Sequence, residues 1–201
     1  MSNTTILIFV ALTLDVIDLF WCSGWWGQMG FGSMLWLKHI FYSQRSRFKK
    51  KKKKCFAISV ISIIESLYKI IYGNDITIEL EEILYCHPHN FSNGGLGDFY
   101  LGYLMMHGLR WKRPKNKIIS IDGFLWIPSF NEGYLLVAVA HQPVIAHMKV
   151  GQIFQNWKWC GIYEGEDDAL EKIDGSYVWH AIVIRGYCEE NGQKYFDIQN
   201  S

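Results

Sequence analysis

Residues 55–72 read CFAISVISIIESLYKIIY, and this stretch decides the fold class of the chain. Its polar side chains recur every three or four positions, which is the spacing of a helix, and apolar side chains occupy the other faces. We therefore expect a helix that is buried over most of its circumference. It ends at Gly73 and Asn74, because both residues tolerate the left-handed conformation that a helix end requires. The polar positions are Ser59, Ser62, Glu65, Ser66 and Lys69.

Two further helices are expected downstream of this one. Residues 96–106 are mostly apolar and stop before Gly108. Asn131 can cap another helix, since its side-chain oxygen accepts a free backbone N–H, and residues 135–140 would be the buried part of that helix.

The last third of the chain changes character toward strands. Apolar side chains alternate over residues 144–149, residues 161–163 follow, and residues 179–187 form an apolar run rich in β-branched side chains. Residues 190–192, Glu-Asn-Gly, predict a hairpin turn that joins this run to residues 194–199. Helices followed by strands predict an α+β fold with two packed lobes.

Composition and charge narrow the class of protein. The chain has 201 residues, a net charge of +1, 50% hydrophobic and 16% aromatic residues, which excludes a disordered chain and suits one packed domain. Residues 38–54 are strongly basic and end in six consecutive lysines, 49–54. The six lysines have no interleaved aromatics, and the sequence shows no second basic face, so we interpret the run as a solvated loop or an insertion and expect no nucleic-acid partner.

Residues 1–54 are atypical, and we treat them apart from a domain at 55–201. Residues 6–14 are apolar except for Thr13, which is too short a run to span a bilayer. They could form the apolar region of a secretory signal, although no Lys or Arg precedes them. Residues 20–42 are rich in tryptophan and follow no clear period, so no element is assigned to them.

One cysteine, Cys55, lies at a position that favours a reactive thiol. Cys55 lies in the first turn of the predicted helix, where unpaired N–H groups and the helix dipole favour the thiolate form. A lone cysteine is more often a buried structural thiol, but His180 and Asn200 follow it near the two ends of the predicted hairpin. The order Cys, His, Asn with long gaps is typical of papain-type enzymes.

The segments around these three residues resemble the papain-family cysteine proteases of the plant type. The resemblance covers residues 55–201 and implies a papain-like fold, with the Cys helix in a helical lobe and the His and Asn in an antiparallel β lobe. The matching segments are Cys55-Phe-Ala-Ile-Ser59 with Glu65, Leu80-Glu81-Glu82 with Cys86, Asn93-Gly94-Gly95, 131–140 with Gln142-Pro143-Val144, Phe154, 161–165, 180–183, Gly186-Tyr187 and 194–201.

The resemblance implies cysteine-type endopeptidase activity through a thioester acyl-enzyme, with no metal or cofactor. Cys55 would be the nucleophile, His180 its acid/base partner and Asn200 the residue that orients the imidazole. Gly94 and Gly95 would line the cleft. Ala181 would wall the pocket for the second residue of the substrate.

The same resemblance implies partners and a location. Polypeptides would be the substrates, cystatin-like proteins the inhibitors, and the protein itself a monomer without a membrane span. Such proteases belong to the secretory pathway, in the vacuole or lysosome or outside the cell.

Two departures from the family leave alternatives open. Lys49 stands where the family has an oxyanion-binding Gln; a faint match at 28–33 would make Gln28 that residue and 34–54 an insertion. The chain also stops at Ser201, before the last strands that the family has. The alternatives are therefore a catalytically inactive homologue that binds or inhibits, or a non-functional gene fragment.

The five cysteines do not follow the family's disulfide pattern. By the resemblance, Cys86 occupies a bridge position whose partner segment is shortened, and Cys22, Cys160 and Cys188 match no bridge. Cys86, His87 and His89 lie close together, but no second Cys/His pair completes a zinc site, so we expect no metal.

Overall fold

The computed structural model describes ten helices and strands built from separate parts of the chain. The described residues are 7–14, 55–85, 101, 105, 109–111, 117–119, 121–129, 131–151, 154, 162–163 and 178–200. The helices are α2 (Cys55–Tyr72), α3 (Leu80–Tyr85) and α5 (Glu132–His141). The strands are β1 (Leu7–Leu14), β2 (Leu109–Trp111), β3 (Lys117–Ile119), β4 (Gly123–Ile127), β5 (Val144–Lys149), β6 (Trp179–Glu190) and β7 (Gln193–Gln199).

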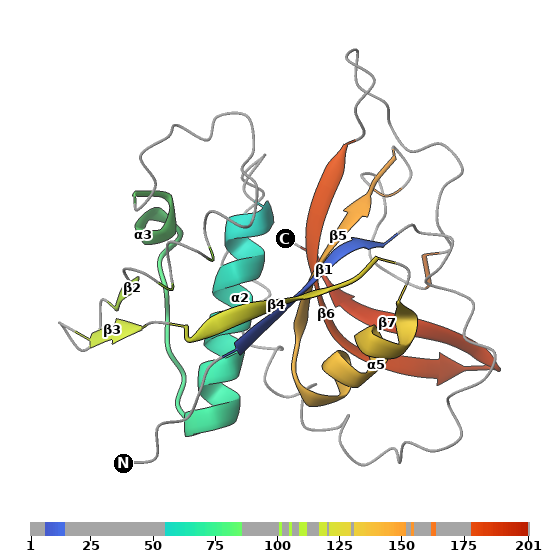
Figure 1. The fold of residues 1–201 in the computed structure, drawn as a ribbon, viewed down its shortest axis with the longest axis horizontal. Helices are drawn as coiled ribbons and strands as arrows, with labels where there is room; N and C mark the ends of the chain where they lie inside the picture. The colour runs from blue at the N-terminus through green and yellow to red at the C-terminus, as the bar shows by residue number, and fades with distance from the viewer. Residues whose placement is uncertain are drawn as a thin grey trace.

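Helix α2 lies between α3 on one side and the large sheet on the other (Figure 1). The predicted helix is confirmed, and every residue from Phe56 to Leu67 is buried. Its length and apolar composition would suffice to cross a membrane, but 67% of it is buried inside the protein, as in a core helix. It ends as predicted at Gly73, which has a φ of 71° and donates its N–H to the carbonyl of Lys69 at 2.9 Å.

The polar positions of α2 are more deeply buried than an amphipathic helix requires. The Ser66 hydroxyl donates to the carbonyl oxygen of Ser62 at 2.5 Å, one turn earlier. The Glu65 carboxylate accepts the backbone N–H of Ile78 at 2.8 Å. Because these polar groups find partners within the protein, burying them costs less than the pattern alone suggests. Of the five polar positions, Lys69 reaches the surface and pairs with Asp75.

The large sheet has the strand order β4-β1-β5-β6-β7. Strands β5, β6 and β7 are antiparallel, as predicted for the lobe that carries His180 and Asn200. Strand β1, from the segment that could have been a secretory signal, runs parallel to both of its neighbours, β4 and β5, so the whole sheet is mixed.

The predicted hairpin turn is confirmed at Asn191 and Gly192, which have φ angles of 52° and 79°. The expected strand at 161–163 is wrong where the structure describes it, because Ile162 and Tyr163 belong to no strand. Strands β5 and β6 pair directly with each other, which leaves no place for a strand between them.

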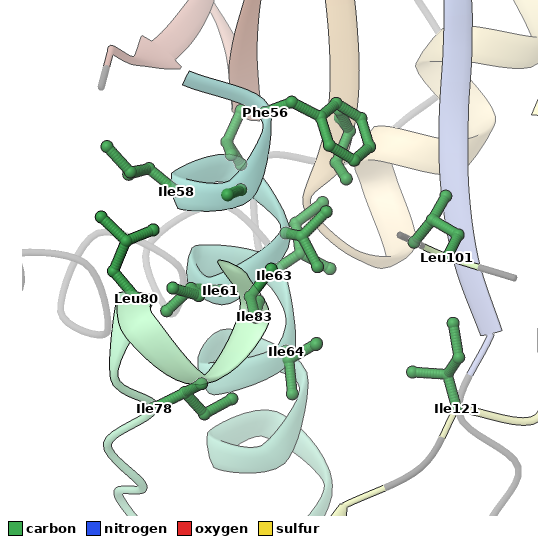
Figure 2. Packing of buried hydrophobic residues seen from close by; sticks show 14 of the residues in the cluster. Phe56, Ile58, Ile61, Ile63, Ile64, Ile78, Leu80, Ile83, Leu101 and Ile121 are labelled. Carbon is green, nitrogen blue, oxygen red and sulfur yellow. The ribbon is translucent and has the colours of Figure 1, made fainter. Parts of the chain in front are cut away.

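Two hydrophobic clusters cover the opposite faces of the sheet. Alternate residues of β5 and β6 point to α2, and the residues between them point to α5, as the pleat of a strand requires. Figure 2 shows the α2 cluster, in which isoleucines of α2 meet side chains from the chain around α3. The first cluster includes Ile145, Ala181 and Val183 from the sheet, and the second includes Val144, Ala146, Met148, Ile182 and Ile184.

Helix α5 forms where Asn131 predicts it. The Asn131 side chain accepts the N–H of Tyr134 at 3.1 Å, which confirms the cap. The buried part differs in one respect from the prediction, because Val137 is 46% exposed on the outer face of the helix. Within the helix predicted at 96–106, the structure describes Leu101 and Met105, and both are helical. The rest of that range lies outside the described residues.

Candidate active site

The first residue of helix α2 is Cys55, whose side chain is half-buried and makes no disulfide. The next residue, Phe56, anchors this end of the helix, since its ring is buried and meets the His147 ring of β5 edge-on at 5.4 Å. The cysteine is therefore held by a helix that is packed into the core from its second residue onward.

His180 and Asn200 come from the ends of the β6–β7 hairpin. His180 is the second residue of β6, opposite Met148 of β5, and Asn200 follows the last residue of β7. Antiparallel pairing brings the two ends of the hairpin together, and His180 Nε2 lies 2.5 Å from Asn200 Oδ1. With the amide oxygen as acceptor, Nε2 carries the proton, and the ring is oriented with its other nitrogen available to Cys55. The Phe154 ring, with its centroid 5.7 Å from that of His180, packs against the imidazole.

The Cys55 thiol and the His180 imidazole perturb each other. Burial alone would raise the pKa of Cys55, but the hydrogen bond and positive charge of His180, with smaller contributions from the Ala181 and Phe56 backbone, hold it below the ordinary 9.0. Burial alone would lower the pKa of His180, but its hydrogen bond and charge interaction with Cys55, and its bond to Asn200, hold it above 6.5. Both shifts favour a thiolate–imidazolium pair.

Such a pair can carry out nucleophilic chemistry. The thiolate is the reactive form of cysteine, and an adjacent imidazolium can later deliver its proton to a leaving group. The positive end of the α2 helix dipole also favours negative charge at this place. The arrangement suits attack on an electrophilic carbon such as a carbonyl.

The other predicted site residues have different outcomes. Ala181 is buried in β6 next to His180, where its backbone also interacts with Cys55. Gly94, Gly95 and Gln28 lie outside the described residues, as does Lys49.

Two features of the β6–β7 hairpin and its contacts were not predicted from the sequence. One is the packing of Phe154 on His180, which depends on a loop whose course no local pattern specifies. The other is an irregularity in the pairing of β6 with β7 at Arg185, whose guanidinium lies 2.5 Å from the carboxylate of Asp197. Gly186, directly after Arg185, is the one sequence signal for it, because glycine within a strand often marks a bulge.

A family model described as papain family cysteine protease matches residues 47–201. The chain belongs to the papain family. Among curated papain-family relatives, a probable cysteine protease of Arabidopsis thaliana, RDL5, is 31% identical over 74% of this chain and 43% of its own length. The low-temperature-induced cysteine proteinase of Solanum lycopersicum is 32% identical over 73% of this chain and 46% of its own length. This papain-family chain therefore spans less than half the length of the curated relatives that it matches.

Solved structures confirm the predicted α+β, papain-like fold. A Carica candamarcensis cysteine protease in complex with E-64 superposes with a TM-score of 0.59 and 25% identity, over 74% of this chain and 72% of the other. The bromelain protease of Ananas comosus, at 20% identity and a TM-score of 0.54, shares the fold over 79% of this chain and 78% of its own.

Proposed function

We propose that this chain hydrolyses peptide bonds, with Cys55 as nucleophile, His180 as acid and base, and Asn200 as the residue that orients the imidazole. The contact of the Cys55 thiol with the His180 ring, whose other nitrogen meets Asn200 Oδ1, is the observation that carries this proposal. Membership of the papain family and plant cysteine proteases at about 30% identity support it.

The reaction follows from the two protonation states of the pair. The Cys55 thiolate attacks the peptide carbonyl carbon, a C–S bond forms, and the negative charge moves to the carbonyl oxygen. When the C–N bond breaks, the His180 imidazolium gives its proton to the leaving amine and a thioester remains. Neutral His180 then takes a proton from water, whose oxygen attacks the thioester and releases Cys55 and the acid product.

Charge on the oxyanion needs hydrogen-bond donors. Backbone N–H groups at a helix start have no partner within the helix and can serve as such donors, and Cys55 is the first residue of α2. Gln28, proposed from the sequence as an additional donor, stays a prediction. Gly94, Gly95 and Ala181, proposed to line the substrate cleft, likewise stay predictions.

The direct test is labelling with an epoxide that alkylates active-site thiols, followed by mass spectrometry and a peptide-cleavage assay. We expect one label per molecule on Cys55 and cleavage that the label abolishes. Cys188→Ala is the matched control, because Cys188 is the other described cysteine that makes no disulfide and is also half-buried. It should keep both labelling and cleavage, whereas Cys55→Ala should lose both. A folded protein that neither labels at Cys55 nor cleaves any peptide overturns the proposal in favour of an inactive homologue.

Substrates, assembly and location are part of the same proposal. Polypeptides are the substrates, cystatin-like proteins the inhibitors, a monomer is the working unit, and the secretory pathway is the location. Asn90-Phe91-Ser92 is a glycosylation sequon, so a glycosidase-sensitive mobility shift of protein purified from its native source would support the location.

A further inference from the structure

Helix α2 and the β6–β7 hairpin meet at a second point, besides the contact of Cys55 with His180. The amide nitrogen Nε2 of Gln199 lies 3.4 Å from the hydroxyl oxygen of Ser62, within hydrogen-bond distance. Gln199 is the last residue of β7 and directly precedes Asn200. The residue that meets the imidazole is therefore the immediate neighbour of one that reaches α2.

Ser62 lies on the same face of α2 as Cys55, because about two helical turns separate the two residues. The helix thus meets the hairpin at its first residue, through His180, and again about 10 Å farther along its axis, through Gln199. A single contact leaves two elements free to pivot about it. Two separated contacts fix the angle between the helix and the hairpin.

The register of the hairpin directs the Gln199 side chain toward α2. Gln199 is opposite Val183 of β6, and paired residues of an antiparallel sheet point to the same side. Val183 belongs to the hydrophobic cluster that α2 forms, whereas Ile198, one residue before Gln199, packs against the cluster on the opposite face. The direction of the Gln199 side chain is therefore set by the pairing of the strands.

The polar groups at this second contact are buried. Ser62 is 2% exposed, and Gln199 Oε1 is buried with no hydrogen-bond partner among the described residues. Burying an amide whose oxygen is left without a partner costs free energy, and an apolar side chain of the same length would avoid that cost. Stability alone therefore gives no reason for a glutamine at this position.

We propose that the hydrogen bond between Gln199 and Ser62 is a positioning contact, which fixes Asn200 relative to α2. It ties the end of β7 to the helix and thereby holds the Asn200 amide oxygen against the His180 imidazole. Gln199 and Ser62 act through Asn200, and neither takes part in the reaction itself. The proposal rests on the proposed function of the Cys55–His180 pair.

The test follows the Cys55 thiol in Gln199→Met, which keeps the length of the side chain and removes its amide. The rate of Cys55 alkylation is measured against pH, because the pKa of this thiol depends on the bond and charge of His180. An imidazole that is held less firmly stabilises the thiolate less, so the alkylation profile should move to higher pH. We expect kcat/KM to fall on the order of 10-fold, less than in Asn200→Ala. A loss of stability alone would leave the alkylation profile in place.

Double variants then locate the origin of the shift. Ser62→Ala should move the profile as far as Gln199→Met does, and the two changes together should add nothing, because each removes the same hydrogen bond. Gln199→Met combined with Asn200→Ala should have the kcat/KM of Asn200→Ala alone, since Gln199 acts through Asn200. Effects that multiply in either combination overturn the positioning contact.

Two control variants make the same chemical changes away from the contact. Gln193→Met alters the glutamine at the other end of β7, and Ser66→Ala removes a buried hydroxyl that donates to the Ser62 carbonyl and not to the hairpin. Both should keep the alkylation profile of the unmodified protein, whatever they cost in stability. Gln199 is half-exposed, so Gln199→Met remains informative even if Ser62→Ala does not fold. An equal shift in either control, or no shift in Gln199→Met, overturns the proposal.

Alkylation requires no peptide cleavage, which separates this proposal from the proposed function. A profile that shifts in Gln199→Met, in a protein that cleaves no peptide, would support the positioning contact and overturn the protease. Peptide cleavage with the same alkylation profile in Gln199→Met as in the unmodified protein would support the protease and overturn the positioning contact.

Discussion

Cys55 and His180, the proposed nucleophile and its proposed acid/base partner, are held by two very different regions. Helix α2, which carries Cys55, is buried without interruption from Phe56 to Leu67. Strand β7, which leads to Asn200, has only half-exposed residues, and its partner β6 is irregular at Arg185. The site thus joins a helix held by core packing, which carries Cys55, to a hairpin held by cross-strand pairs, which carries His180 and leads to Asn200. Substitutions in α2 should mainly cost stability, and those in the hairpin should mainly cost catalytic geometry.

The largest effect is expected where the two regions meet. His180→Ala removes the proposed proton carrier, and kcat/KM should fall on the order of 10⁴-fold or more. The pKa of the Cys55 thiol should rise, because burial, the largest influence on it, then acts without the opposing bond and charge of His180. The rate of thiol alkylation against pH measures this shift. An unchanged alkylation profile would show that the two groups do not interact.

A matched pair of isoleucines tests the difference in packing. Ile61 of α2 is fully buried, whereas Ile198 of β7 is half-buried against the second cluster. Ile61→Ala should lower the free energy of unfolding by about 2–5 kcal/mol. Ile198→Ala should lower it by about 1 kcal/mol. Denaturant titration gives both values, and equal losses would contradict the comparison.

The contribution of the β6–β7 hairpin to the site is tested at Asn200. Asn200→Ala should lower kcat/KM by about 10²-fold, since the imidazole loses the group that fixes its orientation. The proposed reaction requires deprotonated Cys55 and protonated His180, so the dependence of kcat/KM on pH should be bell-shaped, with the alkaline limb set by His180. Asn200 helps to hold the pKa of His180 above its usual value. In the variant the alkaline limb of the kcat/KM profile should therefore move to lower pH, which a purely structural loss would not produce.

The smallest effect concerns the ion pair between Arg185 and Asp197. Both side chains are partly exposed, at 24% and 29%. A double-mutant cycle with Arg185→Met and Asp197→Leu should give a coupling energy of about 0.2–1 kcal/mol, as for other solvent-accessible pairs. A coupling above about 3 kcal/mol would mean that this hairpin is fixed as firmly as α2.

The parts that local chemistry determines could be predicted from the sequence. Helix α2, its end at Gly73, the cap at Asn131 and the turn at Asn191-Gly192 each follow from a few adjacent residues. Pairings between distant segments could not be predicted in this way. No local pattern places β1 between β4 and β5, and the irregularity at Arg185 breaks the alternation on which strand prediction relies.

The same distinction between local patterns and distant pairings applies to the candidate site. The order of Cys55, His180 and Asn200 predicted the three residues that the structure brings together. The register that sets His147 opposite Ala181 was not predicted, because it depends on the pairing of two strands that are distant in the sequence. The identity of each site residue could be read from the sequence, but the residue opposite it in the sheet could not.

The central position of β1 has a consequence for biosynthesis. This strand is the first described element to leave the ribosome, yet its partners, β4 and β5, begin only at Gly123 and Val144. The apolar strand β1 therefore lacks its sheet partners while most of the chain is being synthesised. Contacts between such distant segments form slowly, and exposed strand edges aggregate meanwhile. Production of this protein should thus depend on chaperones that shield its first apolar segment until the sheet closes around it.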